Sequence, residues 1–177
     1  MIWFRNADRR YPFLWETSDQ PPARWHGEGE GPVQYLASNP DAAWAELLRH
    51  EEIADADDLR GVERSLWALE VDEASERVAQ AELAAAVVTG GLDSYDACRV
   101  EARRLRTAGS SALSAPSAAL LPGAARGQRV AGGLVEAPER DGVVLALFGP
   151  RPIVTGWLCV ESGRPPERLL PLVRRFA

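Results

Sequence analysis

Short strand-like and helix-like segments follow one another in irregular order along this chain, and this order restricts the possible folds more than any other feature. Regular alternation of strands and helices would indicate a parallel sheet, and a repeat of about 20–50 residues would indicate a solenoid or a propeller. The sequence has neither. Two halves of a 177-residue chain would also each be short of core. We therefore predict an α+β fold, a mixed sheet core with flanking helices, in a single domain over residues 1–177.

Five segments have the apolar, aromatic or β-branched composition of strands. They cover residues 2–5, 33–37, 65–71, 143–148 and 153–160. Polar residues from Asn6 to Arg10 are expected to end the first strand, and residues 17–31, rich in Pro and Gly, predict a surface loop. Gly149-Pro150 joins the last two segments, which are therefore predicted to form a hairpin.

The sequence Asn39-Pro40-Asp41 marks the start of a helix. Asn caps free amides, Pro is tolerated in the first turn, and Asp favours the positive end of the helix dipole. The helix is predicted over residues 40–51 and carries an apolar stripe. Glu46 and His50 lie one turn apart on a neighbouring face, so the helix presents a carboxylate and an imidazole together.

Two further helices are predicted downstream. Residues 73–88 are rich in Ala, which favours a helix that ends before Gly90. Asp93 or Ser94 can cap the next helix, which is expected to run through Arg106 and to end at Gly109.

The charge of the chain limits its partners. All 20 residues counted as Lys or Arg are Arg, and the formal net charge is −6 with a pI near 5.0. Guanidinium forks suit phosphate groups, but nucleic-acid binding through a broad field needs clustered positive charge. We expect no direct nucleic-acid binding. Arg99, Arg103 and Arg106 share one face of the predicted helix, which is interpreted first as a solvated face and second as a surface for an acidic partner.

The sequence lacks the residue patterns of several common types of functional site. Cys98 and Cys159 form no CxxC or CxxH pair and are interpreted as buried thiols. His26 and His50 belong to no metal-binding spacing, so no metal is expected. Ser117 stands in Ala-Pro-Ser-Ala, whereas many hydrolases carry their serine in Gly-x-Ser-x-Gly.

Residues 26–32 are rich in Gly but do not form a nucleotide-binding loop. Glu28 and Glu30 would repel an anion, and no Gly-Lys-Ser or Gly-Lys-Thr follows, so the segment is interpreted as a turn that leads into the second strand. The apolar start of the chain is too short for a signal peptide, and no apolar run of about 18 residues follows. We expect no membrane association and a cytoplasmic location.

One combination of residues is more informative than any of its members taken singly. It joins two guanidinium forks, two aromatic rings, a helix carboxylate and a hydroxyl: Arg5, Arg24, Trp25, Tyr35, Glu46 and Ser117. The surrounding stretches are residues 3–5, 23–26, 31–38, 42–46 with His50, and 116–118. In these stretches the chain resembles the RES domain family, which is named for Arg, Glu and Ser and includes toxins of bacterial toxin–antitoxin pairs. The family usually has Asn where this chain has His26.

The resemblance implies an ADP-ribosyltransferase-like fold and an enzyme that consumes NAD as its substrate, with a cognate antitoxin as its protein partner. Cleavage of the nicotinamide–ribose bond builds positive charge on the ribose, and a nearby carboxylate stabilises that charge. Glu46 is the candidate for this role. Arg5 and Arg24 would hold the pyrophosphate, Tyr35 would face the nicotinamide, and Ser117 would orient Glu46 or NAD. The catalytic candidates are Glu46, Arg5, Tyr35 and Ser117, and the NAD-binding candidates are Arg24, Trp25, Arg5 and Tyr35.

Alternatives remain open at the level of sequence. Phosphate, water and a macromolecule all suit an oxocarbenium acceptor, so the attacking group is not assigned. The chain could instead transfer ADP-ribose to a protein or a nucleic acid. It could also be a catalytically inactive binding module with the RES fold, since His26 replaces the family Asn.

Overall fold

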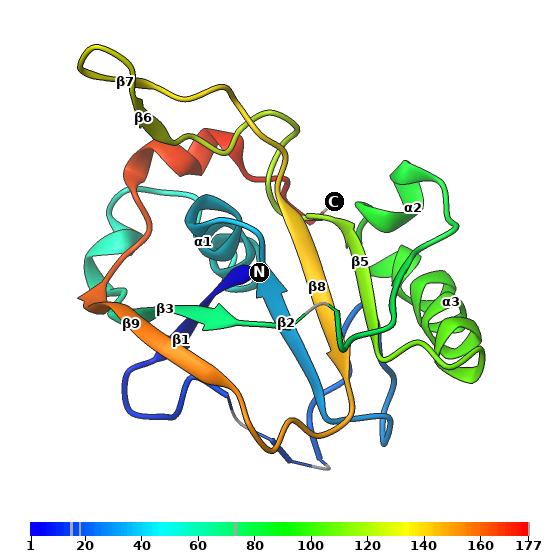
Figure 1. Ribbon diagram of the computed structural model, residues 1–177. Helices are drawn as coiled ribbons and strands as arrows, with labels where there is room; N and C mark the ends of the chain where they lie inside the picture. Colours follow the sequence, from blue (N-terminus) through cyan, green and yellow to red (C-terminus); the bar gives the residue numbers. More distant parts are fainter. Residues whose placement is uncertain (15, 18, 73, 177) are drawn as a thin grey trace.

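The computed structural model describes residues 1–14, 16–17, 19–72 and 74–176 (Figure 1). Its strands are β1 (Ile2–Asp8), β2 (Val33–Ala37), β3 (Arg64–Glu70), β4 (Val78–Gln80), β5 (Ala112–Pro116), β6 (Gln128–Val130), β7 (Leu134–Glu136), β8 (Val143–Phe148) and β9 (Thr155–Gly163). Its α-helices are α1 (Pro40–His50), α2 (Ala85–Val88) and α3 (Tyr95–Thr107), and its 3₁₀ turns are η1 (Asp58–Gly61), η2 (Leu92–Ser94) and η3 (Glu167–Leu172). The main sheet is mixed and has seven strands in the order β4-β5-β8-β2-β1-β3-β9, while β6 and β7 pair separately. The predicted α+β class is confirmed.

The main sheet opens between β1 and β2. β1 pairs with β3 along all seven of its residues but with β2 only at Phe4 and Ala37. β2 pairs along its whole length with β8 instead. As Figure 1 shows, β1, β3 and β9 therefore run across the direction of β2, β8 and β5. This divergence makes room for side chains at the centre of the molecule.

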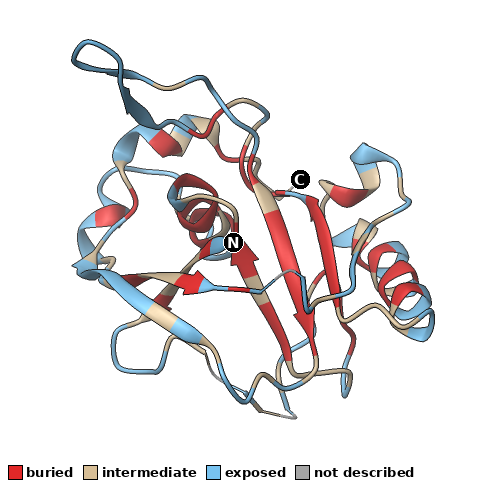
Figure 2. Ribbon diagram, viewed as in Figure 1, coloured by how far each residue is buried: buried red, intermediate tan, exposed pale blue. Residues whose placement is uncertain are grey.

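The two helices α1 and α3 cover the same face of the sheet. Successive residues of a strand point to opposite faces, so Val33, Tyr35 and Ala37 of β2 share one face and Leu36 lies on the other. Ala37 packs in the α1 cluster and Val33 in the α3 cluster. Leu36 packs on the far side with Trp3. Figure 2 shows buried residues along β2, β8 and β5 and on the inner sides of both helices.

The first helix begins as predicted. The Asn39 side chain accepts a hydrogen bond of 2.9 Å from the backbone amide of Ala42, and Pro40 opens the first turn. Arg168 holds the buried Asp41 carboxylate through both of its oxygens, at 2.8 and 3.0 Å. These contacts fix the first turn of α1.

The predicted helix over residues 73–88 is wrong; position 73 itself lies outside the described residues. Val78–Gln80 is a strand that pairs in parallel with β5, and only Ala85–Val88 is helical. The hydrogen-bonding edge that β5 offers in the folded chain overrides the helix propensity of alanine. β5 itself was missed by sequence reasoning, as was the β6–β7 pair.

The predicted hairpin near the C-terminus is also wrong. β8 lies inside the sheet with β2 on one side and β5 on the other, so neither of its edges is free for β9. β9 pairs with β3 at the edge of the sheet instead. The Gly149-Pro150 turn therefore starts a crossover between two separate positions in the sheet.

The end of β1 and the start of α3 differ from expectation. β1 continues to Asp8 because Asn6, Ala7 and Asp8 pair with β3. α3 ends at Thr107, just before the predicted stop at Gly109, where φ is +92°, a backbone conformation that favours glycine. Ser94 stands at the start of α3 but does not cap it, since its hydroxyl donates to the carbonyl of Gly91 at 2.7 Å.

The two cysteines lie in different environments. Cys98 is buried as expected, but Cys159 is exposed on the edge strand β9. No helix in the described part of the chain has the length and apolar character needed to cross a bilayer.

Candidate active site

A cleft of about 270 Å³ lies between α1 and α3 at the divergence of β1 and β2. Five of the six predicted site residues line it, although they come from β1, the loop before β2, β2 and α1: Arg5, Arg24, Trp25, Tyr35 and Glu46. The sixth, Ser117, is buried directly behind the lining, between Pro116 and Ala118, which do line the cleft. The fold therefore brings the predicted set together in one place.

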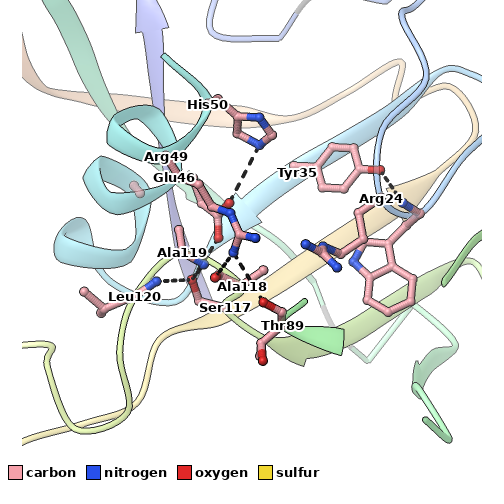
Figure 3. Close-up of polar contacts among 12 residues, drawn as sticks. Arg24, Tyr35, Glu46, Arg49, His50, Thr89, Ser117, Ala118, Ala119 and Leu120 are labelled. Atoms are coloured by element: carbon pink, nitrogen blue, oxygen red, sulfur yellow. Dashed lines mark hydrogen bonds and ion pairs between the residues drawn. The ribbon is translucent and has the colours of Figure 1, made fainter. Parts of the chain in front are cut away.

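Glu46 projects from the middle of α1 toward the cleft and is held by two neighbours (Figure 3). The Ser117 hydroxyl donates a hydrogen bond of 2.8 Å to Oε1 of Glu46. His50, one turn later on α1, places its Nε2 3.9 Å from Oε2 of Glu46. The Glu46 side chain is 27% exposed, so the carboxylate is oriented but still accessible to a ligand.

Ser117 is itself fixed by the backbone around it. Its Oγ accepts hydrogen bonds from the amides of Ala119 at 3.2 Å and Leu120 at 3.1 Å. With two amides donating to this oxygen, its own proton is directed to Glu46. Ser117 thus orients the carboxylate and does not reach the cleft surface.

Tyr35 connects the loop before β2 to the sheet. Its hydroxyl accepts a hydrogen bond of 3.0 Å from the amide of Trp25 and lies 2.9 Å from Nδ1 of His26. Nε2 of His26 lies 2.9 Å from the carbonyl of Pro21, which can only accept. Nε2 of His26 therefore carries a proton, and in the neutral ring Nδ1 accepts from the Tyr35 hydroxyl. Burial raises the pKa of Tyr35 well above its usual value and keeps it protonated.

His26 is thus a fully buried ring with a hydrogen-bond partner at each nitrogen. Burial lowers the pKa of His26 below its usual value of 6.5. Since the folded state resists a proton that the unfolded state accepts, this group contributes full stability above pH of about 6.5 and loses it as the pH falls further.

We expect the free energy of unfolding to decrease between about pH 7 and pH 5.5, and the His26→Gln variant to lack most of this decrease. Chemical denaturation at a series of pH values measures it. The His50→Gln variant, at the exposed histidine, is the matched control and should keep the wild-type slope. An equal slope in wild type and His26→Gln would contradict the lowered pKa of His26.

Arg5 lies in the opening between β1 and β2. Its Nη1 donates to Oε1 of Gln34 at 2.6 Å. Burial, with the neighbouring charge of Arg64 as a second cause, lowers the pKa of Arg5 to about 10, which leaves it charged at neutral pH. Arg64 lines the same cleft, and its buried Nε has no hydrogen-bond partner. Arg64 donates from Nη2 to Asn6 at 3.3 Å. Among the described residues both guanidinium groups keep donors without a partner, an arrangement that suits an anion with more than one negative charge.

Arg24 and Arg49 hold one wall of the cleft. Nη2 of both residues donates to the carbonyl of Gly90, at 2.8 and 2.6 Å, and Nη1 of Arg24 donates to the Ser94 hydroxyl at 3.0 Å. The Arg24 guanidinium also lies 4.5 Å above the ring of Tyr95. Arg24 is thus largely committed to shaping the cleft, and fewer of its donors than those of Arg5 are left for a ligand.

Arg49 and Arg64 are candidate site residues that sequence reasoning missed. Arg49 follows Glu46 by three residues on α1, and this spacing places both on one face of the helix. That signal was available in the sequence, whereas Arg64 is adjacent to the site only through the pairing of β3 with β1.

The arginine face of α3 is not simply solvated, contrary to the first interpretation. Nε of Arg99 donates to the carbonyl of Ala23 at 2.9 Å, and Nε of Arg103 pairs with Glu30 at 2.5 Å. The Arg106 guanidinium packs 5.3 Å from the ring centre of Phe148. Two of these arginines hold the loop that carries Arg24, Trp25 and His26, so this face helps to build the cleft.

The charges that line the cleft are unequal. Four arginines line it, namely Arg5, Arg24, Arg49 and Arg64, and in the part of the chain that the structure describes none of them forms an ion pair with a carboxylate. Glu46 is the acidic group oriented among them, and Glu51 lies at the rim. The described residues contain no group of three or more His, Cys, Asp or Glu placed to hold a metal ion.

Fold and cleft together define an α+β protein whose cleft combines one oriented carboxylate with unpaired guanidinium groups. The model of the RES domain family matches residues 2–131, and the chain therefore belongs to this family. Membership is consistent with a toxin-like function related to NAD. No curated protein sequence matches the chain.

Proposed function

We propose that this protein is a toxin-like enzyme that cleaves the nicotinamide–ribose bond of NAD and is neutralised by a cognate antitoxin protein. The observation that carries the proposal is the charge arrangement of the cleft. One carboxylate, Glu46, is held in place by Ser117 among four arginines that have no carboxylate partner among the described residues. NAD matches both signs, since its pyrophosphate is anionic and its ribose becomes cationic as the bond breaks.

Glu46 would act on the reacting sugar. The C1–N bond of the nicotinamide riboside breaks with its electrons moving to the ring nitrogen, so nicotinamide leaves as a neutral molecule and positive charge develops on the ribose. A fixed carboxylate close to that charge stabilises the transition state more than the ground state. Ser117 supports this role because its hydrogen bond fixes Oε1 of Glu46 before the substrate arrives.

The remaining residues would bind the dinucleotide. Arg5 would bind the pyrophosphate with its free donors, and Arg24 and Trp25 would form the wall against which NAD packs. The ring of Tyr35 lines the cleft while its hydroxyl holds the backbone of Trp25, which supports a position beside the cationic nicotinamide. The antitoxin would act by covering this cleft.

The test is product analysis. The purified chain is incubated with NAD, with and without inorganic phosphate, and the products are identified by mass. Nicotinamide with ADP-ribose phosphate indicates phosphorolysis, nicotinamide with free ADP-ribose indicates hydrolysis, and label from NAD on a macromolecule indicates ADP-ribosyl transfer. A cooperatively folded chain that neither consumes NAD nor releases nicotinamide would contradict the proposal and leave the inactive binding module.

A further inference from the structure

The turn that carries Ser117 is held by arginine side chains from two distant parts of the chain. Its four residues, 117–120, are buried and lie outside the named helices and strands, so their carbonyl oxygens need partners from elsewhere in the chain. Arg49 Nη1 donates to the carbonyl of Ala118. The other three carbonyls are bonded by a single residue, Arg174.

Arg174 contacts the turn with both its side chain and its backbone. Its Nη1 donates to the carbonyl of Ser117 at 3.0 Å and to that of Leu120 at 2.7 Å. Its amide donates to the carbonyl of Ala119 at 2.7 Å. Next to these contacts, Leu120 pairs with Val173 as an antiparallel bridge. The segment 173–176 therefore fixes the turn.

The same segment also reaches the second arginine that holds the turn. The ring of Phe176 lies 4.5 Å from the Arg49 guanidinium and 6.0 Å from the ring of His50, the other neighbour of Glu46. Residues 173–176 lie beyond the part of the chain that matches the family model, which ends at residue 131. The support of the Ser117 turn thus comes from a part of the chain to which the family match assigns nothing.

We propose that Arg174 is a positioning residue for Glu46, acting through the turn and the Ser117 hydroxyl; this rests on the proposed NAD cleavage. The line of contacts is continuous. Arg174 bonds the carbonyls at both ends of the turn, the turn directs the amides of Ala119 and Leu120 to Ser117 Oγ, and Ser117 donates to Glu46. Arg174 does not line the cleft, so it would change the rate of the chemical step and not the binding of NAD.

Arg174→Gln should lower kcat for NAD cleavage roughly 10- to 100-fold, because a small displacement of a catalytic group has an effect of this size. KM should change less than about threefold, since no contact to substrate is removed. Ser117→Ala should have a similar effect. The kcat of the double variant should be no lower than that of the more strongly impaired single variant, since both substitutions act on the same contact to Glu46. Multiplied effects, or a changed KM with an unchanged kcat, would overturn the proposal.

Hydrogen exchange gives a readout that needs no turnover. The amides of Ala119 and Leu120 should exchange at least about tenfold faster in Arg174→Gln than in wild type. Arg168→Gln is the matched control: it removes an arginine of the same C-terminal region that binds Asp41 at the start of α1 and does not touch the turn. It should leave both kcat and the exchange of these two amides unchanged, even where it lowers the melting temperature.

The two measurements separate this proposal from the proposed function. If wild type does not consume NAD, the proposed function fails, and the exchange data alone decide whether Arg174 orders the turn. If wild type is active and Arg174→Gln keeps its kcat or its slow amide exchange, the positioning role is wrong while NAD cleavage stands. Equal losses of kcat in Arg174→Gln and Arg168→Gln would show that kcat follows overall stability, and this result would also overturn the positioning role of Arg174.

Discussion

Replacing Glu46 by Gln is expected to lower kcat for NAD cleavage by roughly 10²–10³-fold, the usual effect of removing one preorganised electrostatic partner of a transition state. Gln keeps the size of the side chain and an oxygen that can accept from the Ser117 hydroxyl, so the change removes the negative charge and little else. Because the Glu46 side chain is partly exposed, the free energy of unfolding should stay within about 1 kcal/mol of wild type. Initial rates of nicotinamide release, with thermal unfolding of the same samples, measure both quantities.

Glu51→Gln is the matched control for this variant. Glu51 lies at the rim of the same cleft and loses the same charge in the same substitution, but it has no contact with Ser117. Its kcat should stay within a few-fold of wild type. A Glu46→Gln variant that folds normally and cleaves NAD as fast as Glu51→Gln would remove the carboxylate from the mechanism. Growth arrest on expression should be lost with Glu46→Gln and retained with Glu51→Gln.

Replacing Arg5 by Ala is expected to weaken NAD binding by roughly 10- to 100-fold, because hydrogen bonds to charged groups contribute about 1.5–3 kcal/mol. Arg5 is already largely removed from water, and among the described residues its donors beyond the one to Gln34 have no partner and are available to the pyrophosphate. The affinity is best measured by calorimetry in the Glu46→Gln background, where slow turnover leaves NAD intact. The NAD affinity of Arg5→Lys should fall between those of Arg5 and Arg5→Ala, since Lys keeps the charge but lacks the forked guanidinium donors.

Arg10→Ala serves as the control for charge alone. Arg10 lies just beyond β1 and is exposed, with its guanidinium paired to Asp8 at 2.7 Å. Removing it changes the net charge by the same amount without touching the cleft, so NAD affinity should be unchanged. If Arg5→Ala binds NAD as tightly as Arg10→Ala, the pyrophosphate is held elsewhere in the cleft.

Parts of the fold were predictable because their signals are local. α1 follows from Asn39, Pro40 and Asp41, and the structure shows the predicted cap at the predicted position. β2 and β8 also have the predicted bounds. The helix predicted over residues 73–88 failed because the partner that turns Val78–Gln80 into a strand is β5, more than thirty residues later in the chain.

The candidate site, like the fold, was predictable only where its signals are local. The pairing of Glu46 with His50 follows from one helical turn, and the structure places the two side chains 3.9 Å apart. The hydrogen bond between Ser117 and Glu46 joins residues 71 positions apart, and no periodicity in the sequence specifies it. Only the resemblance to the RES domain family placed Ser117 in the set beforehand.

What the sequence by itself determined is local. It specified the start of α1, the helix face on which Glu46 and His50 lie, and several strands. It also showed that Arg is the basic residue in place of Lys. The tertiary structure decided the order of the strands, the opening between β1 and β2 that admits Arg5, and the meeting of Arg174, Ser117 and Glu46. The physical reason is the range of the interactions. Propensity, capping and periodicity depend on neighbours within a few residues, whereas a backbone carbonyl or a buried guanidinium is satisfied by whichever group the packing brings within about 3 Å.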